Sequence, residues 1–168
     1  MNKVFLLLGG NQGNVFETFS LARHKISEKV GPVSLASSFY QSEAWGFESD
    51  HLFLNQVLLA ETLLEPVELL QTLLEIETSL GRTRLAGVME SRSIDIDILF
   101  YNQQVIINPG LEIPHPRLHL RRFTLLPLAE IAPDMVHPLM GKTVAEILYS
   151  CNDNQAVHKV NPAVDQAG

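Results

Sequence analysis

Two aspartates stand inside the segment SRSIDIDILF, residues 91–100, which otherwise has the character of a β-strand. Aspartate is depleted in strands, so Asp95 and Asp97 need a reason to be there. Because side chains alternate between the faces of a strand, the isoleucines face the core and the two carboxylates share the other face, roughly 6.5–7 Å apart. Two ionised carboxylates so close repel each other, and a divalent cation such as Mg²⁺ would remove that conflict. The pair therefore indicates either a metal site for phosphates or a strand with one solvated face.

Arginines are concentrated around this strand. Six of the seven lie between residues 82 and 122, namely Arg82, Arg84, Arg92, Arg117, Arg121 and Arg122. Guanidinium groups bind phosphate or carboxylate oxygens in a bidentate way, although on composition alone a solvated basic face is an equal alternative. The first three lie in residues 82–92, which lack periodicity and are predicted to form a loop. Arginines on a loop beside an acidic metal site are what phosphoryl transfer requires, and this favours the metal site.

Two side chains elsewhere suit ligand recognition. His115 lies between Pro114 and Pro116, which disfavour a helix there, so we expect a hydrogen-bonding role for it rather than zinc binding. Asn55 lies inside a predicted strand, and its amide offers one acceptor and two donors to the edge of a heterocycle. The alternative for Asn55 is a polar strand residue whose hydrogen bonds are satisfied within the protein.

The composition limits the class of protein. The 168 residues are about one domain, and their 46% hydrophobic content is normal for a globular chain. A net charge of −7 argues against nucleic-acid binding. The single cysteine excludes an internal disulfide and predicts a reducing, cytoplasmic setting. The apolar run VFLLLGG is too short to cross a bilayer, so no membrane association is expected.

The elements that must position these residues are strands mixed with helices. Strands are predicted at residues 3–8, 33–44, 53–62, 94–101, 105–107 and 156–160, and helices at 15–29, 66–80, 123–131 and 144–149. Asn14 is expected to cap the first helix and Thr143 the last. Because the second and third strands follow each other directly, the order favours an α+β fold with helices packed on the sheet, of the ferredoxin-like kind.

The runs GRTRLAGVMESRSIDIDILFY, IPHPRLHLRRF and PLAEIAPDMVHP together resemble the 6-hydroxymethyl-7,8-dihydropterin pyrophosphokinases of folate biosynthesis. The similarity extends from VFLLLGGNQGN to about Val160. It implies a ferredoxin-like α/β/α sandwich with a mainly antiparallel sheet and helices on both faces. It also implies a monomer. The length predicts a single domain at residues 1–160, and the tail at 161–168 is expected to be flexible. Such an enzyme moves the β,γ-diphosphate of ATP onto the pterin hydroxymethyl group and releases AMP, so its partners are two small molecules.

The resemblance assigns roles to individual residues. Asp95 and Asp97 would hold two Mg²⁺ ions on the ATP phosphates, and Arg82 and Arg92 would close on those phosphates as catalytic groups. The other implied ATP contacts are Arg84, Ile98, His115 and Arg121. The implied pterin contacts are Ser42, Glu43, Trp45, Gly46, Phe53, Asn55 and Phe123.

The chain departs from the family pattern at two places. Met89, Glu90 and Ser91 stand where many members have Trp-Gly-Pro, and Ser42-Glu43 stands where Thr-Pro is common. We expect altered loop packing and kinetics, with the metal, arginine and histidine positions kept. Two other classes stay open: a non-catalytic ferredoxin-like binding module and a metal-dependent phosphohydrolase. AMP release only in the presence of a pterin would separate the transferase from the hydrolase, and a lack of nucleotide binding would favour the binding module.

Overall fold

The computed structural model describes residues 1–11, 14–43, 52–81 and 94–161, which form a main sheet between two layers of helices and a separate two-stranded sheet. The six strands of the main sheet are β1 (Asn2–Gly10), β2 (Val33–Ala36), β3 (Phe39–Glu43), β4 (Leu52–Thr62), β5 (Asp95–Tyr101) and β8 (Val157–Val160). Their order is β5-β1-β4-β3-β8, with β2 also pairing with β4, and every pair is antiparallel.

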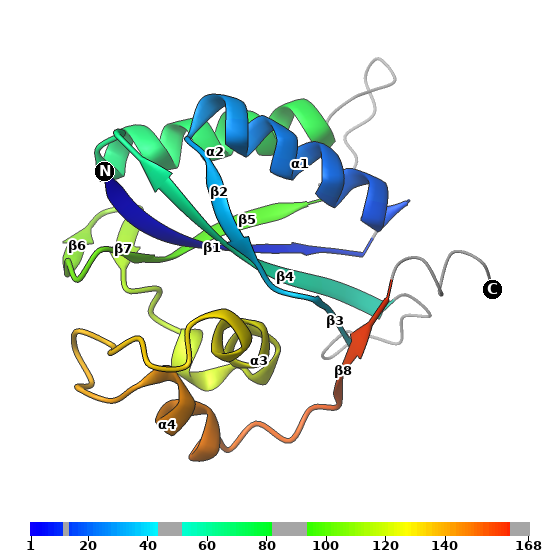
Figure 1. The fold of residues 1–168 in the computed structure, drawn as a ribbon, viewed down its shortest axis with the longest axis vertical. Helices are drawn as coiled ribbons and strands as arrows, with labels where there is room; N and C mark the ends of the chain where they lie inside the picture. The colour runs from blue at the N-terminus through cyan, green and yellow to red at the C-terminus, as the bar shows by residue number, and fades with distance from the viewer. Residues whose placement is uncertain (12–13, 44–51, 82–93, 162–168) are drawn as a thin grey trace.

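Helices cover both faces of this sheet. Helices α1 (Val15–Lys29) and α2 (Pro66–Gly81) lie on one face, which we call the α1/α2 face. Helices α3 (Arg122–Ile131) and α4 (Val144–Tyr149) lie on the other, the α3/α4 face (Figure 1). This arrangement confirms the predicted α+β sandwich. No helix in the described ranges combines the length and apolar character that crossing a membrane requires.

Alternation along β1 divides the core into two clusters. Val4, Leu6 and Leu8 are buried among the residues of α1 and α2. Phe5 and Leu7 belong to the second cluster, which packs against α3 and α4. The continuous apolar run of this strand is therefore explained by burial on both faces.

Local capping explains where two helices begin. The side chain of Asn14 accepts the backbone N–H of Glu17 at 3.2 Å, as expected for the cap of α1. At α4 the Thr143 hydroxyl accepts the N–H of Glu146 at 3.1 Å, and the Glu146 carboxylate accepts the N–H of Thr143 at 2.8 Å. This reciprocal pair is a capping box, so both predicted helix starts are confirmed.

The segment predicted as one strand at residues 33–44 is two strands, and that prediction was wrong. The break falls at Ser37, whose N–H donates to the carbonyl of Val57 at 2.8 Å. The Ser37 hydroxyl accepts the N–H of Val57 at 2.9 Å. A side chain thus replaces one backbone partner, and the chain stays attached to β4 across the break. The prediction also missed β7 (Leu111–Ile113), the short partner of β6 (Ile106–Asn108).

Candidate active site

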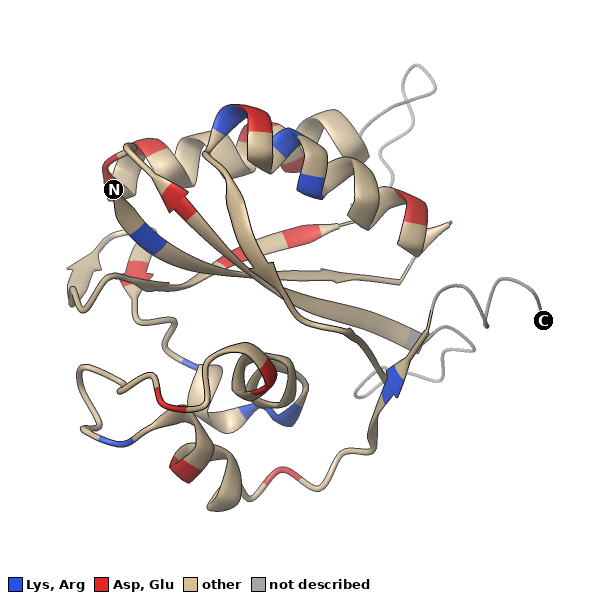
Figure 2. Cartoon of the chain, in the orientation of Figure 1, with Lys and Arg blue, Asp and Glu red and all other residues tan. Residues whose placement is uncertain are grey.

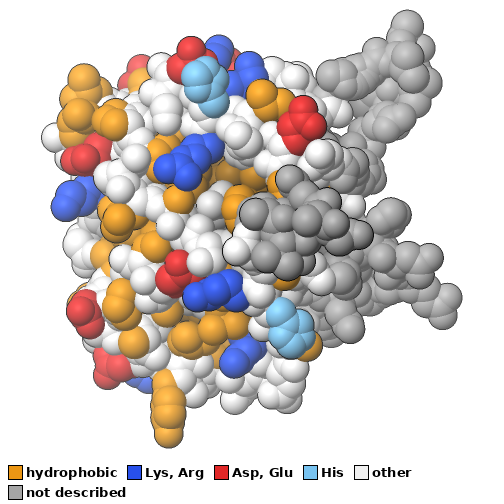
Figure 3. Space-filling view, turned by 45° about the vertical axis from the view of Figure 1, so that its right-hand side comes forward, with side chains coloured by type: hydrophobic (Ala, Val, Ile, Leu, Met, Phe, Trp, Pro, Cys, Tyr) orange, Lys and Arg blue, Asp and Glu red, His pale blue; other side chains and the backbone are white. Residues whose placement is uncertain are grey.

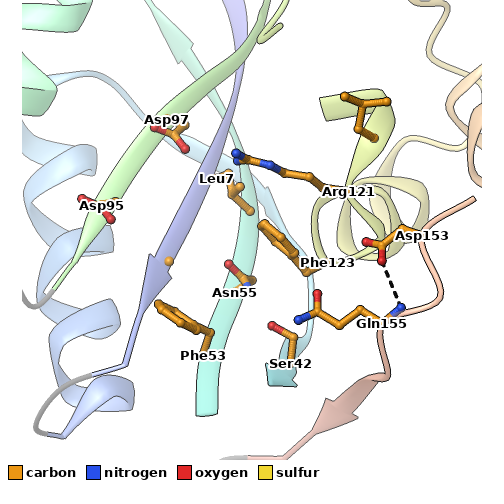
Figure 4. A pocket seen from close by; sticks show the side chains of 12 residues that line it. Leu7, Ser42, Phe53, Asn55, Asp95, Asp97, Arg121, Phe123, Asp153 and Gln155 are labelled. Carbon is orange, nitrogen blue, oxygen red and sulfur yellow. Dashed lines mark hydrogen bonds between the residues drawn. The ribbon is translucent and has the colours of Figure 1, made fainter. Parts of the chain in front are cut away.

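A pocket of about 620 Å³ lies on the α3/α4 face of the sheet, beside the start of α3 (Figure 4). The residues that line it come from four strands, from the 3-10 turn before α3 (Leu118–Leu120) and the start of α3, and from the segment after α4. They are Leu7, Gly9, Ser42, Phe53, Asn55, Asp95, Asp97, Leu120, Arg121, Phe123, Asp153 and Gln155. Most of the predicted site residues that fall within the described ranges are therefore brought together.

Strand β5 presents its two aspartates to this pocket. Ile96 and Ile98 are buried in the core beneath α1 and α2, whereas Asp95 is exposed and Asp97 is half-buried on the opposite face. The predicted placement of the isoleucines in the core and of the aspartates on the opposite face is confirmed. Figure 2 shows these acidic positions on β5 across from basic residues near the start of α3.

The donor set around the aspartates fits a magnesium–phosphate complex. Within the described residues no group of three or more His, Cys, Asp or Glu side chains could hold a metal ion. Asp95 and Asp97 thus offer carboxylate oxygens but do not enclose an ion. Mg²⁺ keeps several waters and is usually bound by one or two carboxylates together with substrate phosphates, so this incomplete shell suits it.

His115 is placed beside Asp97 by an irregularity in β5. The register between β1 and β5 shifts so that Leu99 is an extra residue, and the carbonyl of Leu99 accepts the N–H of His115 at 3.0 Å. The Nδ1 atom of His115 accepts the N–H of Arg117 at 3.1 Å. The proton of the neutral ring is therefore on Nε2, which lies 3.9 Å from Oδ2 of Asp97. Bulges next to active sites commonly redirect a side chain in this way.

Burial and the neighbouring charges have opposing effects on the pKa of His115. Burial lowers the pKa of His115, Asp97 raises it, and Arg121 and Arg117 lower it, with a net decrease. The ring is therefore neutral at neutral pH and can donate from Nε2. Burial and Arg117 also lower the pKa of Arg121, against the influence of Asp97. The guanidinium group still carries its charge at neutral pH because its ordinary pKa is so high.

The other end of the pocket has the features of a site for a flat polar ring. Phe53 and Phe123 present aromatic side chains on either side of the Asn55 amide (Figure 4). Ser42 pairs with Phe53 across β3 and β4, so it borders the same end. The Arg121 guanidinium carbon lies 5.5 Å from the centre of the Phe123 ring, within the range of a cation–π contact. Aromatic faces with a polar edge between them suit a heterocycle.

Comparison with known proteins identifies the family. The model of the family 7,8-dihydro-6-hydroxymethylpterin-pyrophosphokinase matches residues 5–133. The protein named 2-amino-4-hydroxy-6-hydroxymethyldihydropteridine pyrophosphokinase from Porphyromonas gingivalis is 41% identical over 138 residues, which cover 80% of this chain and 93% of that protein. The protein of the same name from Aquifex aeolicus is 40% identical over 146 residues, covering 87% of this chain and 90% of its own. The chain belongs to the dihydropterin pyrophosphokinase family.

Solved structures agree on the fold. The wild-type HPPK-DHPS chain of Plasmodium falciparum superposes with a TM-score of 0.73 over 88% of this chain, at 16% sequence identity. The present chain spans 44% of the length of that one. At this identity the similarity shows the shared architecture, the ferredoxin-like sandwich expected for a pyrophosphokinase domain.

Some of the residues expected to be functional in a pyrophosphokinase are not placed by the structure. Arg82, Arg84, Arg92, Trp45 and Gly46 lie outside the described residues. For Glu43 the backbone is described, in β3, but the side chain is not.

The predicted ATP contact of Ile98 stays a prediction, and the structure limits which of its atoms could make that contact. The Ile98 side chain is 6% exposed and packs in the core on the α1/α2 face, away from the pocket. A contact between this residue and nucleotide can therefore come only from its backbone.

Glu77 is a supporting residue that the sequence reasoning missed. It lies on the buried side of α2, and its Oε2 atom accepts the backbone N–H of Ile96 at 2.6 Å. Ile96 is the residue between the two aspartates, so this bond fixes the strand where it presents them. A signal was available, since Glu77 occupies the apolar face of its helix, four residues after Leu73.

Asp153 and Gln155 were also missed. Both lie in the segment that joins α4 to β8, and both line the pocket. No periodicity or motif marks them in the sequence, because only the return of the chain to β3 brings this segment to the pocket.

Proposed function

We propose that the protein transfers the β,γ-diphosphate of ATP to the hydroxymethyl group of 6-hydroxymethyl-7,8-dihydropterin, in folate biosynthesis. The observation that carries this proposal is one pocket with two chemically different ends. One end has the carboxylates of β5 beside His115 and Arg121, and the other has Asn55 between two phenylalanines. A phosphate chain and a flat heterocycle fit these ends in that order.

The reaction forms one P–O bond, breaks another and releases the hydroxyl proton. The pterin hydroxymethyl oxygen attacks the β-phosphorus of ATP, the bond from that phosphorus to the oxygen bridging it to the α-phosphate breaks, and AMP leaves with that oxygen. The hydroxyl proton passes to solvent. Asp95 and Asp97 would hold two Mg²⁺ ions, which when bound neutralise phosphate charge. Positioning of the two substrates and electrostatic stabilisation of the phosphates then supply most of the acceleration.

The side chains of the pocket divide this work. Arg121 extends from the start of α3 across the pocket in the direction of Asp97 (Figure 4), and its permanent positive charge would lie beside the transferred phosphates. His115 donates from Nε2 without adding a second full charge. Phe53 and Phe123 hold the ring, and Asn55 pairs with its polar edge. Arg82, Arg84 and Arg92 would add charge from the 82–93 segment.

The partners follow from this chemistry. We propose that the protein acts as a monomer in the cytoplasm on two small molecules, ATP and the dihydropterin. On the face drawn in Figure 3, basic side chains are interspersed with apolar and acidic ones, which gives no support to a nucleic-acid partner.

The test is AMP release from ATP, with and without 6-hydroxymethyl-7,8-dihydropterin, followed by phosphorus NMR of the product. We expect AMP only when the pterin is present, together with a pterin diphosphate. EDTA should abolish the reaction and added Mg²⁺ restore it. AMP and free diphosphate without the pterin would indicate a hydrolase, and no AMP from folded protein would indicate a binding module.

A further inference from the structure

The segment between α4 and β8 forms one side of the pocket at its aromatic end. Asp153 and Gln155 both line the cavity, together with Ser42, Phe53 and Phe123. In Figure 4 the Gln155 side chain extends from this segment toward Ser42 and lies on the side of the pocket away from the two aspartates of β5. An amide is thus present at the aromatic end in addition to that of Asn55.

The sheet register explains this position. Ser42 on β3 pairs with Phe53 of β4 on one side and with Val157 of β8 on the other. Gln155 comes two residues before Val157 and therefore enters the pocket beside the residue pair that borders the aromatic end. Placement by the sheet gives Gln155 a defined location although it lies outside any strand.

Asp153 fixes the segment to helix α3. One carboxylate oxygen accepts the N–H of Arg122 at 2.9 Å, and the other accepts the N–H of Gln155 at 3.0 Å. Arg122 is the first residue of α3, and this helix has no side-chain cap of its own from Arg121. A single carboxylate therefore sets the start of α3, which carries Arg121 and Phe123, relative to the backbone of Gln155.

A pterin needs more polar partners than one asparagine offers. The pyrimidine half of a pterin has an amino group, a carbonyl oxygen and ring nitrogens along its edge, and each one buried without a partner costs binding free energy. The side-chain amide of Asn55 can match one donor and one acceptor of that edge. A second amide at the same end can match further groups.

We propose that Gln155 is a substrate-contacting residue that pairs with the polar edge of the dihydropterin and that Asp153 is its positioning residue. This inference rests on the proposed function. Gln155 is then a specificity determinant for heterocycles that carry both hydrogen-bond donors and acceptors. Asp153 acts through backbone hydrogen bonds and does not itself contact the ring.

The test compares the affinities for two ligands in three variants. Dissociation constants for the dihydropterin and for a non-hydrolysable ATP analogue are measured by calorimetry in Gln155→Ala, Asp153→Ala and the matched control Asn154→Ala. Asn154 is the exposed residue between the two. Gln155→Ala should weaken pterin binding roughly three- to tenfold, the effect of about one hydrogen bond, with nucleotide affinity unchanged. Asp153→Ala should weaken both, and Asn154→Ala neither.

Two outcomes overturn the inference. If folded Gln155→Ala binds the pterin with wild-type affinity, Gln155 does not contact the pterin. Equal losses for pterin and nucleotide in that variant assign Gln155 a purely structural role. Failure of the proposed function can be distinguished from failure of this inference. In that case the wild-type protein binds both ligands but releases no AMP.

Discussion

The two faces of the sheet are built from the same strands but serve different purposes. On the α1/α2 face Leu8, Leu54 and Ile96 are all buried, with Gln56 as a buried polar residue paired with Leu8. On the α3/α4 face the apolar cluster ends at Leu7 and Val57. At the next position that faces this side, the strands carry a polar residue or a glycine in place of an apolar one.

The change occurs at Gly9 in β1 and at Asn55 in β4, and one residue pair earlier in β5, where Asp97 pairs with Leu7. Gly9 of β1 pairs with Asn55 of β4 on one side and with Asp95 of β5 on the other. A Cβ atom on Gly9 would lie 3.1 Å from the Asn55 side-chain oxygen, so the missing side chain lets that amide lie against the strand. The pocket therefore exists because one face lacks apolar side chains across this row, while on the opposite face the neighbouring Leu8 and Ile96 are buried in the core.

The largest effect should come from a substitution in the pocket on the α3/α4 face. We expect Asp97→Ala to lower turnover by on the order of a hundred- to a thousandfold or more, since it removes a metal-holding carboxylate. Its free energy of unfolding should change by less than about 1 kcal/mol, because Asp97 is not part of the apolar core. AMP release and urea unfolding measure the two quantities. Asp97→Asn, which keeps the size but not the charge, should be nearly as inactive; wild-type turnover in either variant contradicts the metal assignment.

At Ile96, the neighbour of Asp97 on the α1/α2 face, a substitution should lower stability but not turnover. Ile96→Ala should lower the free energy of unfolding by about 2–5 kcal/mol, because Ile96 is 5% exposed in the core beneath α1 and α2. Its turnover per folded molecule, measured at low temperature, should stay within a few-fold of wild type. The milder Ile96→Val should cost about 0.5–1.5 kcal/mol. Loss of turnover without loss of stability would show that the faces are not separable here.

The difference between the two faces of β5 was largely predictable from the sequence. Alternation in IDIDIL placed the isoleucines in the core and the aspartates in the site, and this needs only the period of a strand. The start of α1 at Val15 followed from the capping potential of Asn14. Local rules were sufficient wherever the determining contacts are close in sequence.

Features set by distant contacts could not be predicted. The break at Ser37 is stabilised by Val57, twenty residues away. The carbonyl of the extra residue Leu99 in β5 accepts the N–H of His115, and the sequence of the strand gives no sign of this irregularity. The same holds for Asp153, whose partner Arg122 lies 31 residues away. Such pairs depend on the assembled sheet and not on local propensity.

Glu77 offers a sharper test, because it is a polar group within the apolar face. Glu77→Ala should lower the free energy of unfolding by about 1–3 kcal/mol, since the buried N–H of Ile96 loses its acceptor. Turnover should fall as well, because that N–H lies between the two aspartates. Glu77→Gln keeps an acceptor oxygen and should recover most of both losses. If the glutamine variant is as impaired as the alanine variant, the charge of Glu77 matters more than the hydrogen bond.

The smallest effect concerns how α3 is held over the functional face. The Glu130 carboxylate accepts hydrogen bonds from the Tyr40 hydroxyl at 2.6 Å and from the Ser38 N–H at 3.0 Å, and Lys159 lies 3.9 Å away. Burial alone would raise the pKa of Glu130, but the hydrogen bonds from Tyr40 and Ser38 and the charge of Lys159 outweigh it and lower the pKa below its usual 4.5. The carboxylate thus ties the last turn of α3 to β3 and β8.

This tie predicts an acid dependence of stability with a definite sign. A carboxyl group whose pKa is lowered by folding stabilises the folded state fully above its unfolded pKa, and this contribution is lost as the pH falls through the folded pKa. Glu130→Gln should therefore be less stable than wild type by about 1 kcal/mol at neutral pH, a modest value because solvent screens a partly exposed group. The difference should shrink below about pH 4.5. Urea unfolding of both proteins at neutral pH and at about pH 3.5 checks this; parallel pH profiles would mean that Glu130 holds α3 without its charge.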